Sequence, residues 1–296
     1  MSVAFSWNLV DDVQQLLSYH FMLNALRAGT IVAVVCGAIG YFMVLRRQSF
    51  VGHTLAVIGF PGAAGATWLG ISTGFGYYGL CVAGALVIAM LPGAGRGGTG
   101  LGGAGEESAV VGTVQGFALA CGFLFVTQYK GFLSGLTGLL FGTITGVSDT
   151  QVIVLLISGV CVLAVLAVGG RVLLFASVDP DVARARGVSV RLVGTGFLLL
   201  LAVAVAGASQ ITGSLLVFAL LVAPAATAAR LTARPGAGVV LSVTLAVAVT
   251  WLGEALAFFT PYPIGFWVTT LAFGAYVLAT AAQTAAQRLG RRVVIA

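Results

Sequence analysis

The chain has 296 residues, of which 59% are hydrophobic and only 7% are charged. Soluble domains carry roughly 25% charged residues, because a hydrated surface needs them. The 14 basic residues behind the net charge of +6 are scattered between apolar runs and do not form a basic patch. The composition therefore excludes a soluble globule, a disordered chain, a disulfide-rich secreted scaffold and a nucleic-acid-binding domain. It predicts an all-α, polytopic helical membrane protein.

The N-terminal segment 1–19 predicts a helix that lies on the membrane interface. Trp7, Leu9 and Leu16 are among its apolar residues at helical spacing. Asp11 and Asp12 stand where a signal peptide would carry basic residues, so we expect no cleaved leader.

Nine apolar runs follow, separated by short breaks rich in Gly, Pro or Arg. The runs cover 21–45, 54–71, 75–92, 109–127, 150–169, 192–209, 212–229, 237–258 and 264–286. Since a span needs about 20 apolar residues, they predict a transmembrane domain over 20–287 with about eight to nine helices. A tail over 288–296 follows it. A re-entrant segment at 131–146 would change the count, and Pro61 and Pro224 predict broken helices within their runs.

The arginines predict the orientation of the chain. With nine crossings and an outside N-terminus, twelve of the 14 basic residues fall on the cytoplasmic side, as the positive-inside rule expects. They are Arg46, Arg47, Arg96, Arg171, Arg184, Arg186, Arg191, Arg230, Arg234, Arg288, Arg291 and Arg292. Only Arg27 and Lys130 lie elsewhere. The C-terminus is therefore expected in the cytoplasm.

Two loops differ from the rest. The Gly-rich loop at 93–108 lacks the Gly-Lys-Ser/Thr ending of a phosphate-binding loop, and Lys130 is the only lysine in the chain. We interpret it as a flexible linker and expect no nucleotide site.

The second loop, at 175–191, predicts a short polar helix over 179–187. Asp179, Pro180 and Asp181 form a typical helix start, and Gly187 is a plausible stop. This segment is either an ordinary loop helix or a rigid element that docks a soluble partner.

Ionisable residues at membrane depth are candidate functional residues, because they are costly in hydrocarbon. His53 opens the second run, where an imidazole can bind a transition metal, carry protons or simply hydrogen-bond a neighbouring carbonyl. Glu254 lies late in the eighth run and is predicted either to pair with Arg27 or to act in translocation. Asp149 and His20 are further candidates near span ends. The four cysteines are far apart in apolar stretches and predict neither disulfides nor a metal cluster.

Several motifs, in their order along the chain, resemble the membrane permeases of the zinc/manganese family of ABC importers. The resemblance begins at about residue 20 and covers nearly all the rest. It is carried by NALRAG at 24–29, GYFMVLRRQSFVGHTLAVIGFPG at 40–62, FGTITGVSD at 141–149, SVDPDVARARGV at 177–188, ITGSLLVFALLVAPAATAARL at 211–231, and GE at 253–254 followed by PYPIG at 261–265.

The resemblance implies a homodimer in the cell membrane with a pathway for divalent zinc or manganese on the dimer axis. It implies cytoplasmic ABC ATPase subunits that hydrolyse ATP, so this chain itself is no enzyme and binds no cofactor. It also implies an extracellular metal-binding protein or lipoprotein, and surrounding lipid, as partners. The segment 179–187 then matches the coupling helix that docks into the ATPase, through Asp179, Asp181, Ala183 and Gly187.

The chain departs from the family pattern at the pathway. Family members commonly carry Asp and, four residues later, His as metal ligands, where this chain has His53 and Val57. His53 can still ligate together with its symmetry mate, but the second ligand is absent, and Glu254 is a carboxylate that the family tends not to carry. Selectivity would then come from the binding protein.

Two alternative hypotheses are an ABC permease for an iron chelate or vitamin, and a proton-coupled secondary transporter that uses Glu254, Arg27 and His53. A membrane enzyme is the least favoured of the alternatives.

Overall fold

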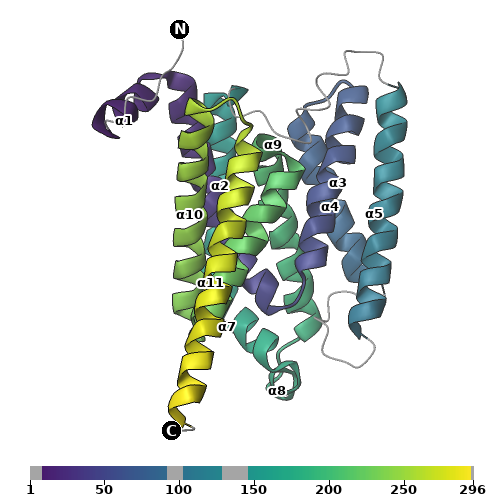
Figure 1. Cartoon of the computed structure of the whole chain (residues 1–296). Coiled ribbons are helices and arrows are strands. Elements are labelled where there is room, and N and C mark those ends of the chain that lie inside the picture. Colours follow the sequence, from purple (N-terminus) through teal and green to yellow (C-terminus); the bar gives the residue numbers. More distant parts are fainter. Residues whose placement is uncertain (1–8, 92–102, 129–145, 295–296) are drawn as a thin grey trace.

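The computed structural model describes residues 9–91, 103–128 and 146–294, which form helices joined by short turns. The linker predicted over 93–108 lies outside the described residues up to 102, but its residues 103–108 form the start of a helix and not a flexible loop. The re-entrant candidate at 131–146 lies outside the described residues up to 145. The helices are α1 (Leu9–Ser18), α2 (His20–Leu45), α3 (Ser49–Trp68), α4 (Thr73–Met90), α5 (Gly103–Gln128), α7 (Asp149–Val178), α8 (Pro180–Ala185), α9 (Val190–Leu231), α10 (Pro235–Phe259) and α11 (Ile264–Val294). Figure 1 shows the long helices as one bundle, with the chain termini at opposite ends.

Eight helices in the described part of the chain are long and apolar enough to cross a membrane. The helix α9 is two helices merged across a kink at Gly213, where φ is 76° and ψ is 157°. Its second arm, Leu216–Leu231, is apolar but shorter than a full span. With the eight candidate spans, this arm gives nine apolar helical segments in the described part of the chain. The prediction of a polytopic bundle with eight to nine helices is confirmed.

The predicted breaks at Pro61 and Pro224 are wrong, because α3 and α9 run through both prolines. A proline removes one backbone donor, but packed membrane helices tolerate that loss. The break in α9 falls instead at Gly213, where the positive φ suits a residue without a Cβ.

The helix α9 lies at the centre of the packing. The helix α2 contacts it and also packs against α10 and α7. Two of its glycines allow close approach. A Cβ on Gly37 would lie 2.8 Å from Val243 Cα on α10, and one on Gly40 would meet the Leu221 carbonyl of α9. The Ser242 hydroxyl donates a 2.7 Å hydrogen bond to the Gly37 carbonyl. Small residues thus bring backbones together, as is typical of membrane bundles.

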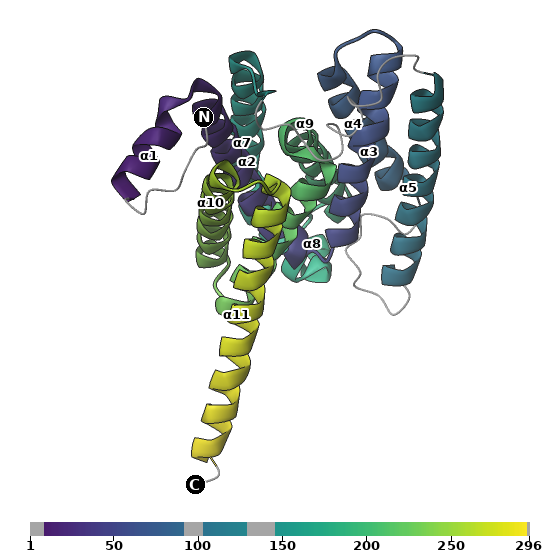
Figure 2. The ribbon, with the colours of Figure 1, turned by 45° about the horizontal axis from the view of Figure 1, so that its top comes forward.

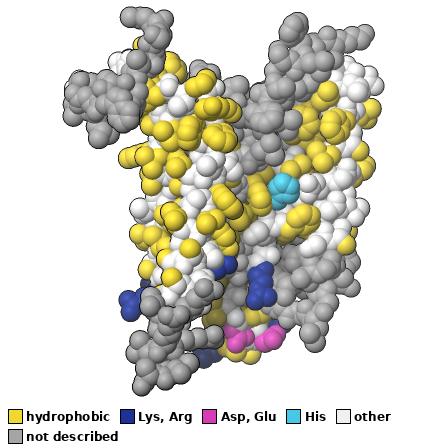
Figure 3. Space-filling model, in the orientation of Figure 1, with side chains coloured by type: hydrophobic (Ala, Val, Ile, Leu, Met, Phe, Trp, Pro, Cys, Tyr) yellow, Lys and Arg dark blue, Asp and Glu magenta, His cyan; other side chains and the backbone are white. Residues whose placement is uncertain are grey.

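The outer surface is apolar where lipid would contact it. Phe117 on α5, Val168 on α7 and Leu278 on α11 are 73%, 87% and 72% exposed. Figure 3 shows apolar side chains over the middle of the molecule and charged side chains gathered at the lower end, near α8. A water-soluble protein would not expose such a surface, so the chain is an integral membrane protein.

The two ends of the chain extend beyond the bundle. In Figures 1 and 2, α1 projects sideways at the end opposite α8, while the end of α11 reaches past the other helices. The candidate span in α11 ends at Gln287, and the helix continues to Val294. The interfacial role of segment 1–19 and the tail 288–296 stay predictions.

Candidate functional site

His53 lies one turn into α3 and is half-buried. Its ring contacts Phe218 of α9 edge-on, with 4.7 Å between ring centroids, and faces Phe50 at 6.5 Å. Its Nδ1 is buried and has no hydrogen-bond partner among the described residues. This nitrogen therefore makes no hydrogen bond to a nearby carbonyl. Among the described residues, the contacts that hold the imidazole are those with the two aromatic rings.

Val57 follows His53 by one helical turn and is also half-buried. Residues four apart lie on the same face of a helix, so the two positions of the family pattern stay adjacent. Only His53 offers a ligating atom there.

Glu254 lies inside the protomer, between α10 and α2. It is 3% exposed, and its Oε2 has no hydrogen-bond partner in the described part of the chain. Its carboxylate occupies space that Gly29 leaves open, because a Cβ at that position would collide with Glu254 Oε1. The neighbouring Thr250 hydroxyl is also buried without a partner.

The predicted pair between Glu254 and Arg27 is wrong. Arg27 is exposed, and the ion pairs found among the described residues do not include it. Residues two apart on a helix point about 200° apart, so Arg27 points away from the face that Gly29 presents to Glu254. No contact between described residues joins Glu254 to His53 either.

The predicted polar helix is present as α8, at the end of the bundle that carries the C-terminus (Figure 1). Asp179 caps its start, with its Oδ1 accepting a 3.0 Å hydrogen bond from the Val182 amide. Asp181 and Arg184 form an exposed ion pair of 2.6 Å. Gly187, at φ +82°, ends the turn in the left-handed conformation that glycine accepts without strain.

One side chain fixes α8 against the bundle. Ala183 is fully buried and packs with Ala176 of α7 and Val190 of α9. The polar residues Asp179 and Asp181 stay exposed on the outer side. The helix α8 is therefore short, capped and fixed to the bundle, and its charged side chains are exposed outside the membrane-spanning helices.

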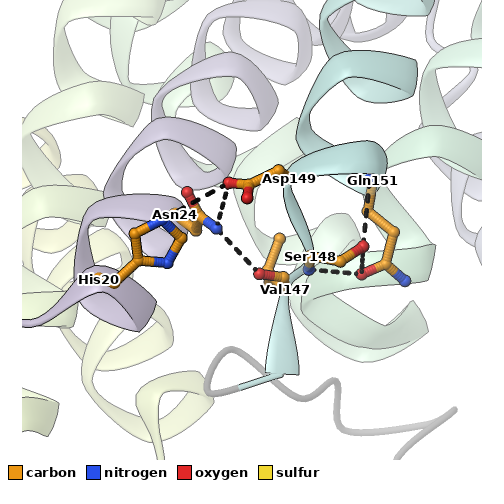
Figure 4. Close-up of polar contacts among 6 residues, drawn as sticks. All are labelled: His20, Asn24, Val147, Ser148, Asp149 and Gln151. Atoms are coloured by element: carbon orange, nitrogen blue, oxygen red, sulfur yellow. Dashed lines mark hydrogen bonds and ion pairs between the residues drawn. The ribbon is translucent and has the colours of Figure 1, made fainter.

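A second polar cluster joins the start of α2 to the start of α7, at the opposite end (Figure 4). The Asn24 amide donates to Asp149 Oδ1 at 2.9 Å and to the Val147 carbonyl at 3.2 Å. His20 Nε2 lies 3.9 Å from Asp149 Oδ1, and both side chains are mostly exposed. The sequence singled out His20 and Asp149 separately, but gave no sign that they meet or that Asn24 connects them.

The described residues contain no group of three or more His, Cys, Asp or Glu side chains placed to hold a metal ion. The four cysteines are free, and Cys36 and Cys81 are fully buried in the apolar core.

The ABC 3 transport family model matches residues 18–283. The chain therefore belongs to this family, whose members are membrane permeases of metal importers. It is 33% identical over 227 residues to the manganese transport system membrane protein MntC of Halalkalibacterium halodurans, covering 77% of this chain and 75% of that protein.

Two further comparisons cover more of the chain. A probable iron transport system membrane protein of Haemophilus influenzae is 26% identical, over 92% of this chain and 97% of the relative. The solved structure titled PsaBC from Streptococcus pneumoniae in complex with Fab matches with a TM-score of 0.79 and 25% identity, covering 92% of this chain and 95% of that one. The fold predicted from the sequence motifs is thus that of solved relatives.

Proposed function

We propose that the chain is the permease subunit of an ATP-driven importer for a divalent metal ion, with manganese or zinc as the cargo. The observation that carries the proposal is α8, a capped polar helix beyond the spans of an ABC 3 family member. The manganese systems among the relatives support manganese as the first ion to test. The iron system from Haemophilus influenzae makes iron the second.

In the proposed mechanism, two copies of the chain pair around a central pathway and two cytoplasmic ATPases bind the α8 helices. ATP-driven closure of the ATPases moves α8 and switches the pathway between its two sides. His53 of each copy faces the pathway and contacts the passing ion. With one ligating side chain per copy, the binding is weak enough for the ion to leave, and an extracellular metal-binding protein supplies selectivity.

The proposal places the end of the bundle that carries α8 in the cytoplasm. Arg46, Arg186 and Arg230 lie at the ends of α2, α8 and α9, and Arg171 lies about two turns before the end of α7. This distribution is the one that the positive-inside rule favours for cytoplasmic loops.

The test is a mild-detergent pull-down of the tagged protein from its native membrane, with mass spectrometry of the co-purified chains. We expect a stoichiometric ATPase with the parental protein, and its loss when Asp179→Lys and Asp181→Lys replace both acidic side chains of the segment by basic ones. The parental protein and the double variant should insert in the membrane equally. The cellular content of manganese and zinc should fall only in cells that carry the variant. A parental protein that brings no ATPase even after crosslinking would overturn the proposal in favour of a secondary carrier.

A further inference from the structure

A buried arginine connects the helix that carries His53 to the junction that carries α8. Arg46 is the C-cap residue of α2 and is only 5% exposed. A guanidinium is costly to bury unless its donors are satisfied. The groups that accept hydrogen bonds from Arg46 therefore show which helices this side chain links.

The Arg46 side chain contacts α7, α9 and the residue before α3. Its Nη1 donates a 3.0 Å hydrogen bond to the Ser177 hydroxyl in the last turn of α7. Its Nε donates a 3.2 Å hydrogen bond to Oε1 of Gln48, the buried residue that precedes α3. Its guanidinium lies over the Phe197 ring of α9, 5.4 Å from the centroid. The planar fork of arginine allows these contacts at once.

The partners lie next to the two functional segments. Ser177 lies two residues before Asp179, the cap of α8. Gln48 lies five residues before His53 in α3. One side chain therefore links the α7–α8 junction directly to the start of α3. No flexible loop intervenes.

The turn that holds Arg46 is itself rigid. The Gln48 amide donates to the Met43 carbonyl and the Arg47 amide to the Val44 carbonyl, each at 3.0 Å. This pair of bonds, with Arg47 at φ 58°, is a Schellman motif that closes the end of α2. A rigid turn transmits movement, whereas a flexible one would absorb it.

We propose that Arg46 is a positioning residue that couples movement of α8 to the helix carrying His53, through Ser177 and Gln48. The proposal rests on the proposed function, since it requires an ATPase that moves α8. Arg46 does not touch the transported ion. Its role is to link each cycle of ATP hydrolysis to a movement of the helix that carries His53.

The neighbouring arginine provides a matched control. Arg47 is exposed and has the same charge, so Arg47→Gln removes a charge without touching the buried contacts. Arg46→Gln removes the guanidinium fork, and Ser177→Ala removes one acceptor while leaving Arg46 in place.

The experiment measures manganese uptake and ATP hydrolysis together, with the full complex in proteoliposomes. We expect Arg46→Gln to keep complex assembly and ATP hydrolysis but to lower the ions moved per ATP about tenfold, within the range of coupling mutations. Ser177→Ala should lower the same ratio about threefold, and Arg47→Gln should leave it unchanged.

Parental ratios in both Arg46→Gln and Ser177→Ala would overturn the coupling role. If complex assembly, ATP hydrolysis and uptake all fall equally in Arg46→Gln, Arg46 only stabilises the structure, and this outcome also overturns the coupling role. If Arg46→Gln does not insert, the ratio in Ser177→Ala decides. If the parental complex shows no ATP-linked uptake, the proposed function is overturned as well. If the parental complex shows uptake and both variants move as many ions per ATP as it does, only the coupling role of Arg46 is overturned.

Discussion

Replacing Asp179 by alanine tests whether the local structure of α8 matters for docking. Asp179 Oδ1 accepts the 3.0 Å hydrogen bond from the Val182 amide that closes the first turn. Losing such an N-cap costs about 1 kcal/mol. A helix of six residues is too short to be stable alone, so the cap and the buried Ala183 decide how much of it is formed.

A loss of about 1 kcal/mol lowers the population of formed α8 by up to about fivefold, since 1.4 kcal/mol is a factor of ten. We therefore expect Asp179→Ala to weaken the affinity of the purified ATPase for the permease in nanodiscs by up to about fivefold. The equilibrium dissociation constant is the quantity to measure, at fixed salt.

The matched control is Asp179→Asn, because asparagine caps a helix about as well as aspartate but carries no charge. We expect its affinity to stay near that of the parental protein. An affinity as weak as that of Asp179→Ala would refute the reasoning, since charge and not the cap would then set docking.

Two further predictions concern packing and the pathway. Gly37→Ala should destabilise the protein by about 1–3 kcal/mol, because a Cβ there would lie 2.8 Å from Val243 Cα. Gly79→Ala, where a Cβ meets nothing within 4 Å, should not, and thermal unfolding in detergent separates the two. His53→Ala should lower manganese uptake about tenfold with unchanged ATPase association, and parental uptake would leave His53 with a packing role.

The sequence by itself determined the class of the protein and its local elements. Apolar runs of membrane length follow directly from the cost of exposing a backbone and charges to lipid. The helix α8 was also predictable, from the Asp179 cap to the Gly187 stop, because capping depends on residues a few positions apart. The motifs then pointed to the family that the comparison confirms.

The pathway role of His53, the docking role of α8 and the orientation stay predictions, since they concern partners, a second copy and a membrane. Other failures lie within the chain. Pro61 and Pro224 were expected to break helices, but both lie inside helical segments, and the kink in α9 falls at Gly213 instead.

Only the tertiary structure decided which faces meet. It placed Glu254 against Gly29 and not with Arg27, and it set His53 beside Phe218 from a distant part of the chain. It also buried Arg46, which the sequence presented as one more charge at a span end. The physical reason is that each residue turns a helix by about 100°. Which side chains touch therefore depends on how whole helices are rotated and packed against one another, and no local pattern in the sequence records that.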